Sequence, residues 1–128
     1  MALTQPDIRP YAWRKYTLAA TWSVDWRGDT YTIPEGFRHD GASIPRPVWS
    51  LTGLRPDGLL RAAALLHDAL YRHGGRLPRG WGPQVPISRK DADGAFYGLM
   101  IEAGVPKWRA RMAWRAVRLF GRWSWKRS

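Results

Sequence analysis

The chain has no cysteine, few acidic residues and no long apolar run. Without cysteine it forms no disulfide and offers no thiolate to a metal, which fits a reducing compartment. No stretch approaches the roughly 20 apolar residues that span a bilayer, so we expect no transmembrane segment. The opening MALTQPDIRP lacks the basic and then apolar order of a signal peptide, and none is predicted.

The length of 128 residues predicts a single domain over 1–128 that buries a core without disulfides. We expect an α+β fold dominated by helix: an N-terminal β-hairpin followed by three helices, two of them an antiparallel pair. The expected parts are a hairpin over 10–35, a motif-bearing loop over 36–58, two helices over 59–104, and a basic, tryptophan-rich helix over 105–128.

The hairpin is predicted from the stretch KYTLAATWSVDWRGDTYTIPEGF. Its first half alternates apolar with small or polar residues, the period of a half-buried strand, at Leu18, Ala20, Trp22, Val24 and Trp26. RGD supplies the turn, TYTI the return strand, and Pro34 ends that strand.

Three helices are predicted from their end signals. The first runs from about Leu59 to His73, where two glycines stop it. Ser88 is the expected N-cap of the second, with Asp91 completing an approximate capping box. Gly104 ends that helix and Pro106 opens the third.

The positive charge is concentrated in the second half. Residues 1–60 carry seven basic and six acidic residues, whereas residues 61–128 carry fourteen and four. The segment 106–128 has eight basic residues and no acidic one. One face of the last helix carries Trp108, Met112, Ala116, Leu119 and Trp123. The neighbouring stripe of Arg111, Arg115, Arg118 and Arg122 is predicted to contact an anion or a membrane, and a merely solvated basic face is the alternative.

The stretch LLHDALYRHGG places ionisable residues in an apolar helix. On a helical wheel Leu60, Ala63, Ala64, His67 and Tyr71 share one face, so His67 should point inward and Asp68 should lie at an edge. If the next helix packs antiparallel, Asp93 can bond His67 and leave its other nitrogen to act as a general base. Asp68 and Asp40 then remain as oxygen ligands for a hard cation such as calcium. A core His–Asp–Tyr cluster that only locks the helices together is the alternative.

The sequence resembles an uncharacterised domain family of phages and prophages. The resemblance rests on IPEGFRHDGASIPRPVW, AALLHDALY, SRKDADGAFYGLM and RAVRLFG, and covers about residues 13 to 121. It implies a protein made in the cytoplasm of a bacterial host, with a virion-associated location as one alternative. It implies no activity.

A looser resemblance links the chain to bacterial secreted phospholipases of the A-two class. DGAS at 40–43, HDALY at 67–71 and RKDADGAF at 89–96 are similar to that class's motifs in the same order. The resemblance implies that His67 activates water, that Asp93 orients His67 and that Tyr71 supports Asp93. It further implies that Asp40 and Asp68 hold calcium, and that lipid esters of the host envelope are the substrates. The cysteines of that class are replaced here, by Ala42 among others.

Three other functions stay open. A non-catalytic virion or assembly protein would bind an acidic partner, such as a phage structural protein, through the last helix. A nucleic-acid-binding protein would use arginines on phosphates and Trp114, Trp123 or Trp125 on bases. A metal phosphohydrolase would use His39, His67, Asp68 and Asp93. An enzyme predicts that Asp40, Asp68, His67 and Asp93 converge on an open cleft, whereas a structural cluster predicts that they are occluded and mutually satisfied.

Overall fold

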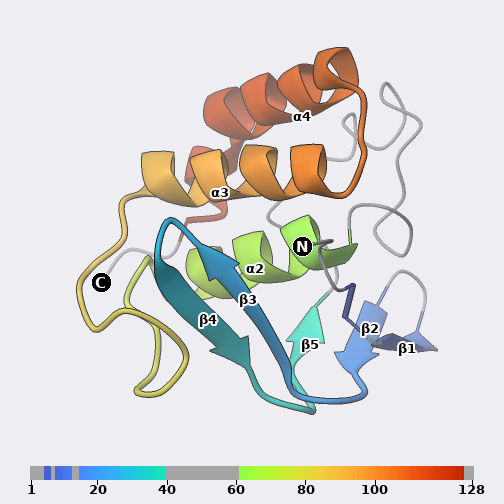
Figure 1. Ribbon diagram of the computed structural model, residues 1–128, viewed down its shortest axis with the longest axis vertical. Helices are drawn as coiled ribbons and strands as arrows, with labels where there is room; N and C mark the ends of the chain where they lie inside the picture. The colour runs from blue at the N-terminus through green and yellow to red at the C-terminus, as the bar shows by residue number, and fades with distance from the viewer. Residues whose placement is uncertain (1–4, 7, 13–14, 40–60, 126–128) are drawn as a thin grey trace.

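The computed structural model describes residues 5–6, 8–12, 15–39 and 61–125. Within these residues, five short strands precede three helices, which confirms the predicted α+β class (Figure 1). The strands are β1 (Ile8–Ala12), β2 (Lys15–Leu18), β3 (Trp22–Trp26), β4 (Asp29–Ile33) and β5 (Arg38–His39). The helices are α2 (Arg61–Arg72), α3 (Arg89–Glu102) and α4 (Lys107–Phe120), and the 3-10 helix η1 (Gly121–Trp123) follows α4 directly.

The predicted hairpin is present as β3 and β4, joined by the two-residue turn Arg27–Gly28. The prediction was wrong about its first strand, because the chain bends at Ala19–Ala20 and splits that strand in two. The earlier half, β2, pairs antiparallel with β1 and β5 in a separate three-stranded sheet. Alternation of apolar residues continues through the bend, so the pattern could not show that two sheets begin there.

The helix ends agree with their signals where the structure describes them. The Ser88 hydroxyl accepts a hydrogen bond from the backbone N–H of Asp91 at 3.1 Å, as an N-cap does. Pro106 immediately precedes α4, and Gly104 has a φ of +93° in the turn between α3 and α4. The start of α2 predicted at Leu59, and Leu60 on its inner face, lie outside the described residues.

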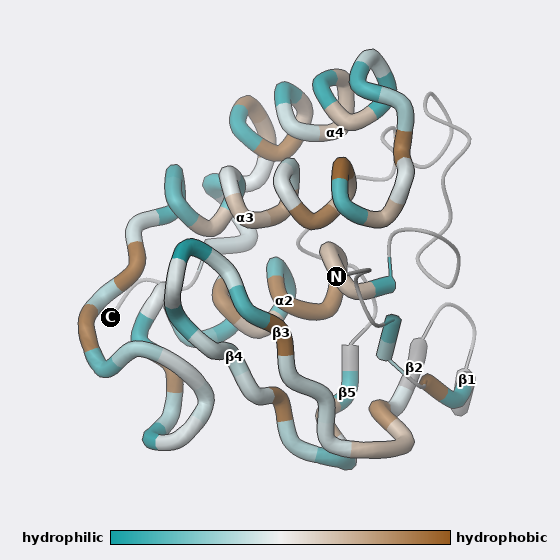
Figure 2. Tube along the Cα trace, in the orientation of Figure 1, coloured by the Kyte–Doolittle hydropathy of each residue, from teal (hydrophilic) through white to brown (hydrophobic). Residues whose placement is uncertain are grey.

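Helix α2 forms the centre of the molecule. Every residue from Ala62 to Tyr71 is buried, including the charged ones. The helix lies next to α3, α3 lies next to α4, and the β3–β4 hairpin crosses in front of α2 with its turn reaching α3 (Figure 1). Apolar residues concentrate along α2 and the adjoining parts of α3, whereas hydrophilic residues recur along α4 (Figure 2). The core therefore lies around α2, and α4 is the outermost helix.

The inner side of α4 is made of small residues. Ala110, Ala113 and Val117 are fully buried against α3. Five larger apolar residues of α4 and η1 are exposed instead: Trp108, Met112, Leu119, Phe120 and Trp123. In the part of the chain that the structure describes, no helix is long and apolar enough to cross a membrane.

Candidate functional site

His67, Tyr71 and Asp93 meet between α2 and α3. The Nε2 atom of His67 lies 2.8 Å from Oδ1 of Asp93, and the Tyr71 hydroxyl donates to the same oxygen at 2.6 Å. His67 and Tyr71 are four residues apart, so both project from one face of α2 toward Asp93. The structure thus brings together three residues with predicted roles: His67 as the base, Asp93 as the carboxylate that orients it, and Tyr71 as the residue that supports Asp93.

Two arginines also donate to Asp93. Arg118 of α4 donates to Oδ2 of Asp93 at 2.8 Å, and Arg89, one turn before Asp93 on α3, approaches the same oxygen at 3.4 Å. Arg89 also donates to the backbone carbonyls of Val117 and Arg118 at 3.1 and 3.2 Å. The five side chains His67, Tyr71, Arg89, Asp93 and Arg118, here called the Asp93 cluster, therefore connect α2, α3 and the C-terminal end of α4.

The Asp93 cluster fixes the protonation of its members. Burial alone would raise the pKa of Asp93, but hydrogen bonds from His67, Tyr71 and Arg118 together lower it below its ordinary value. Burial lowers the pKa of His67, and this outweighs the opposing effect of Asp93. At neutral pH the cluster thus holds an ionised Asp93 beside a neutral His67 whose Nε2 carries the proton. Burial and the bond to Asp93 raise the pKa of Tyr71, which stays protonated.

The Asp93 cluster is closed to solvent at its centre. His67 is 1% exposed and Asp93 is fully buried, while the aromatic rings of Tyr71 and Phe96 lie 4.1 and 4.8 Å from the His67 ring. The outer parts of Arg89 and Arg118 remain partly exposed. The enzyme hypothesis requires Asp40, Asp68, His67 and Asp93 to converge on an open cleft. The structure describes the last three of these; all three are buried, and His67 and Asp93 are bonded to each other.

The predicted calcium ligands are only partly placed. Asp68, predicted to lie at an edge of the inward face, is buried, and it forms an ion pair of 3.4 Å with Arg72. Asp40 lies outside the described residues. Calcium takes six to eight oxygen ligands. Among the described residues no group of three or more His, Cys, Asp or Glu side chains could hold a metal, so this part of the chain does not form a calcium site by itself.

Comparison with known proteins identifies the family. Residues 16–117 match the family model described as "Protein of unknown function (DUF1353)". The chain belongs to this DUF1353 family. The prediction of an uncharacterised domain family is thereby confirmed, whereas phage origin, a phospholipase relationship and calcium remain predictions.

One relative of this DUF1353 protein is the "Uncharacterized protein y4jT" of Sinorhizobium fredii (strain NBRC 101917 / NGR234). The two are 32% identical over 116 residues, which are 90% of this chain and 30% of the relative. The chain thus spans less than a third of that relative's length. No solved structure matches the chain.

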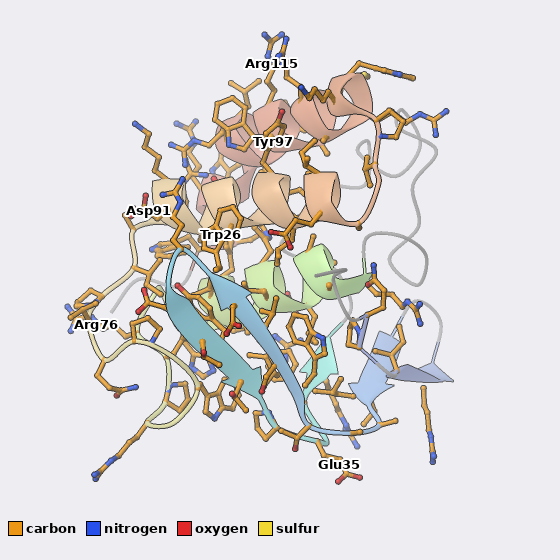
Figure 3. The ribbon with its side chains drawn as sticks, viewed as in Figure 1. Trp26, Glu35, Arg76, Asp91, Tyr97 and Arg115 are labelled. Carbon is orange, nitrogen blue, oxygen red and sulfur yellow. The ribbon has the colours of Figure 1, made fainter. Side chains whose placement is uncertain are left out.

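The four arginines predicted to contact an anion have different surroundings. Arg118 is bound to Asp93, and Arg122 lies over the ring of Trp123 at 4.3 Å from its centroid. Arg111 and Arg115 are exposed on α4 and line a groove above α3. Arg115 points away from the body of the molecule, at the end opposite Glu35 (Figure 3).

Sequence reasoning missed Arg89 as a member of the Asp93 cluster, and it assigned Arg118 to the outer surface. Arg89 stands four residues before Asp93, a spacing that brings the two side chains together on a helix and could have been noticed. The role of Arg118 had no such local signal, because it is 25 residues from Asp93.

Proposed function

We propose that this DUF1353 protein is a non-catalytic binding protein of phage or prophage origin that docks on an anionic membrane surface. The docking surface, here called the α4 face, consists of the exposed large apolar side chains of α4 and η1: Trp108, Met112, Leu119, Phe120 and Trp123. Their exposure is the observation that carries the proposal. Leu119 is 64% exposed and Trp123 is 69% exposed, which is unusual for such side chains clustered on one element.

The composition around the α4 face favours lipid as the partner. Basic residues alternate with the apolar ones, and no acidic residue occurs from 106 to 128. Tryptophan and phenylalanine prefer the boundary between headgroups and acyl chains, and arginines bind lipid phosphates. Arg111 and Arg115, both exposed on α4, would supply this second contact.

The buried Asp93 cluster supports a non-catalytic role. A general base must reach the proton that it removes, directly or through one water. His67 is almost fully buried and Asp93 has four donors on its two oxygens. The arrangement supports a clamp that holds the end of α4 on α3, because Arg118 and the carbonyls bound by Arg89 belong to α4.

Sedimentation with vesicles tests the proposal. The protein should pellet with mixed phosphatidylcholine and phosphatidylglycerol vesicles and not with phosphatidylcholine alone. The double variant Trp108→Gln, Leu119→Gln should bind at least about tenfold more weakly, because it removes apolar contact with the bilayer. Val85→Gln is the matched control, since Val85 is equally exposed (63%) but lies outside the α4 face.

Two outcomes would overturn the membrane proposal. Equal binding to both vesicle types would show that anionic lipid is not required, and an equal loss in Val85→Gln would show that the α4 face is not the docking surface. Binding to polyglutamate without binding to vesicles would assign the surface to an acidic protein partner instead.

A second candidate is a calcium-dependent ester hydrolase. It is favoured by the hydrogen bond between Nε2 of His67 and Oδ1 of Asp93, because that bond fixes the orientation of the His67 ring and the tautomer with its proton on Nε2, while Tyr71 donates to the same oxygen. This is the arrangement that the phospholipase resemblance implies. The described residues supply one of the implied calcium ligands, Asp68, and do not complete a calcium site, so no step through calcium is derived.

Calorimetric titration with calcium tests the second candidate. Binding that Asp68→Asn abolishes and Asp91→Asn retains would support it, since Asp91 is an exposed carboxylate on α3. Phospholipid hydrolysis that is lost in His67→Gln would then establish it. Absence of binding up to about millimolar calcium would contradict it, because known protein sites for calcium bind at or below that range.

A further inference from the structure

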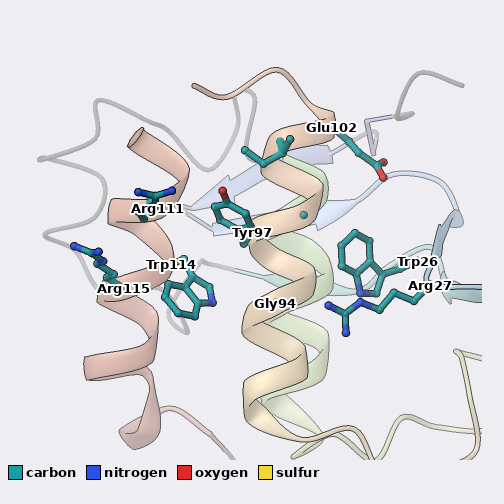
Figure 4. Close-up of a pocket in the computed structure, with 10 residues that line it drawn as sticks. Trp26, Arg27, Gly94, Tyr97, Glu102, Arg111, Trp114 and Arg115 are labelled. Carbon is teal, nitrogen blue, oxygen red and sulfur yellow. The ribbon is translucent and has the colours of Figure 1, made fainter. Parts of the chain in front are cut away.

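A groove of about 660 Å³ crosses α3 between the β3–β4 turn and α4. Figure 4 shows Trp26 and Arg27 on one side of α3, Arg111, Trp114 and Arg115 on the other side, and Tyr97 on α3 between them. Its volume is within the range of small-molecule sites, about 300–1,000 Å³. Its walls thus combine three half-buried aromatic side chains with three exposed arginines.

Two glycines one turn apart on α3, Gly94 and Gly98, line the groove. A Cβ at Gly98 would lie 1.8 Å from the Trp26 ring, so packing of that ring requires this glycine. Among the described residues, a Cβ at Gly94 would meet only the Arg27 Nη2 atom, at 4.0 Å. Glycine weakens a helix interior, and no close packing by the described residues requires a glycine at position 94. An open groove above it explains the glycine.

The turn at the groove's edge is held in an uncommon conformation. Arg27 has a φ of +50°, which makes it a non-glycine residue in the left-handed region, and Gly28 follows with a φ of +82°. Two-residue hairpins of this kind favour Asn, Asp or Gly at the first position. The Arg27 guanidinium lies over the Trp26 ring, 5.4 Å from its centroid. The strained turn thus places a cation beside an aromatic wall.

We propose that this groove binds a nucleotide, as a free molecule or as a unit of a single strand. A base would stack on the aromatic walls, because every base has a π-face that such side chains accept. Arg27, Arg111 and Arg115 would pair with phosphate. Glu102, which also lines the groove, would accept a hydrogen bond from an amino or sugar hydroxyl group. Three aromatic side chains in one small site favour this planar ligand over a lipid headgroup or an acidic peptide.

The test is competition between adenosine monophosphate and a fluorescent thymidine oligonucleotide, followed by anisotropy. Adenosine monophosphate should compete at least about tenfold better than inorganic phosphate or adenosine, because the groove would hold both parts of the molecule. If the oligonucleotide binds much more tightly than the monophosphate, the natural ligand of the groove is a unit of a single strand. Comparable affinities per nucleotide would indicate a free nucleotide.

Gly94→Leu is the blocking variant. Leucine favours a helix and its side chain would enter the groove, so nucleotide affinity should fall at least about tenfold while the circular dichroism of the helices is retained. Leu119→Gln is the control, since it lies on the α4 face and should leave nucleotide binding unchanged. Gly94→Leu should in turn leave vesicle binding unchanged, which separates this site from the membrane proposal.

Three results would overturn the nucleotide proposal. The first is that adenosine monophosphate does not compete up to about 1 mM, which leaves only negligible affinity. The second is that Gly94→Leu binds adenosine monophosphate as tightly as the wild type. The third is that polyglutamate competes as well as adenosine monophosphate does.

Discussion

Gly121 lies directly against the hydroxyl group of Tyr71. A Cβ at position 121 would stand 2.6 Å from Oη of Tyr71 and 3.2 Å from its nearest ring carbon. The same hydroxyl donates to Asp93 at 2.6 Å, so it has no room to move without breaking that bond. The first residue after α4 is therefore fitted to the Asp93 cluster.

Gly121→Ala should lower the free energy of unfolding by about 1–3 kcal/mol, the usual cost of an overpacked core. Chemical denaturation measures it. Gly94→Ala is the matched control, which should stabilise α3 by up to about 1 kcal/mol because, among the described residues, its methyl group makes only an ordinary contact with Arg27 at 4.0 Å. In a Tyr71→Phe background, Gly121→Ala should lower the free energy of unfolding by less, because the Tyr71 hydroxyl oxygen, the atom nearest to the new methyl group, is absent. An equal cost in both backgrounds would contradict the contact.

Asp93→Asn should destabilise the protein by about 3 kcal/mol or more. The substitution preserves volume but leaves His67 and two arginines facing a neutral amide, and removing one partner of a buried pair is costly. Asp91→Asn, on the exposed side of the same helix, should change the free energy of unfolding by less than about 1 kcal/mol. Similar losses in both variants would show that the Asp93 cluster does not clamp the helices.

Arg118 and Arg115 lie on the same helix but should respond differently to alanine. Arg118→Ala should destabilise the fold because it removes a 2.8 Å bond to the buried Asp93. Arg115→Ala should leave thermal stability nearly unchanged and weaken vesicle binding, because its side chain is exposed. Thermal unfolding and vesicle sedimentation on both variants check this. The reverse pattern would place the anion contact at Arg118.

The burial of His67 predicts a pH dependence of stability. Its pKa is lowered from 6.5 in the folded state, so below about pH 6.5 the unfolded chain binds more protons and stability falls as the pH drops. The slope attributable to one such group is at most about 1.4 kcal/mol per pH unit. The pKa of Asp93 is also lowered, and its contribution is lost only at more acidic pH, below its ordinary value of 3.8.

Chemical denaturation of the wild type and of His67→Gln between pH 7 and pH 5 isolates the contribution of His67 to this pH dependence. The difference in stability between the two should narrow as the pH falls. A constant difference across that range would mean that His67 is not held neutral.

Local spacing was sufficient to predict much of the Asp93 cluster. The four-residue step from His67 to Tyr71 predicted that both side chains lie on one face of a helix, and Ser88 predicted where the next helix begins. Antiparallel packing of the two helices was then enough to predict the bond between His67 and Asp93. Periodicity does not say which face of a helix is inward. On α4 the small residues Ala110, Ala113 and Val117 face the core, and the larger apolar residues face outward.

The remaining features depend on contacts between distant residues. Arg118 reaches Asp93 and Gly121 reaches Tyr71 only because α4 packs back along α3. Likewise β5, two residues long, exists because β2 offers it a partner, and a strand this short has no periodic signal of its own.

The most direct test of the α4 face uses the absence of cysteine. A single cysteine introduced as Leu119→Cys, or as Glu35→Cys at the opposite end of the molecule, gives a unique site for an environment-sensitive fluorophore (Figure 3). With phosphatidylglycerol-containing vesicles, the label at 119 should shift to shorter wavelength and the label at 35 should not, because only the α4 face enters the lipid boundary. An unchanged spectrum at 119, or an equal shift at 35, would contradict the account.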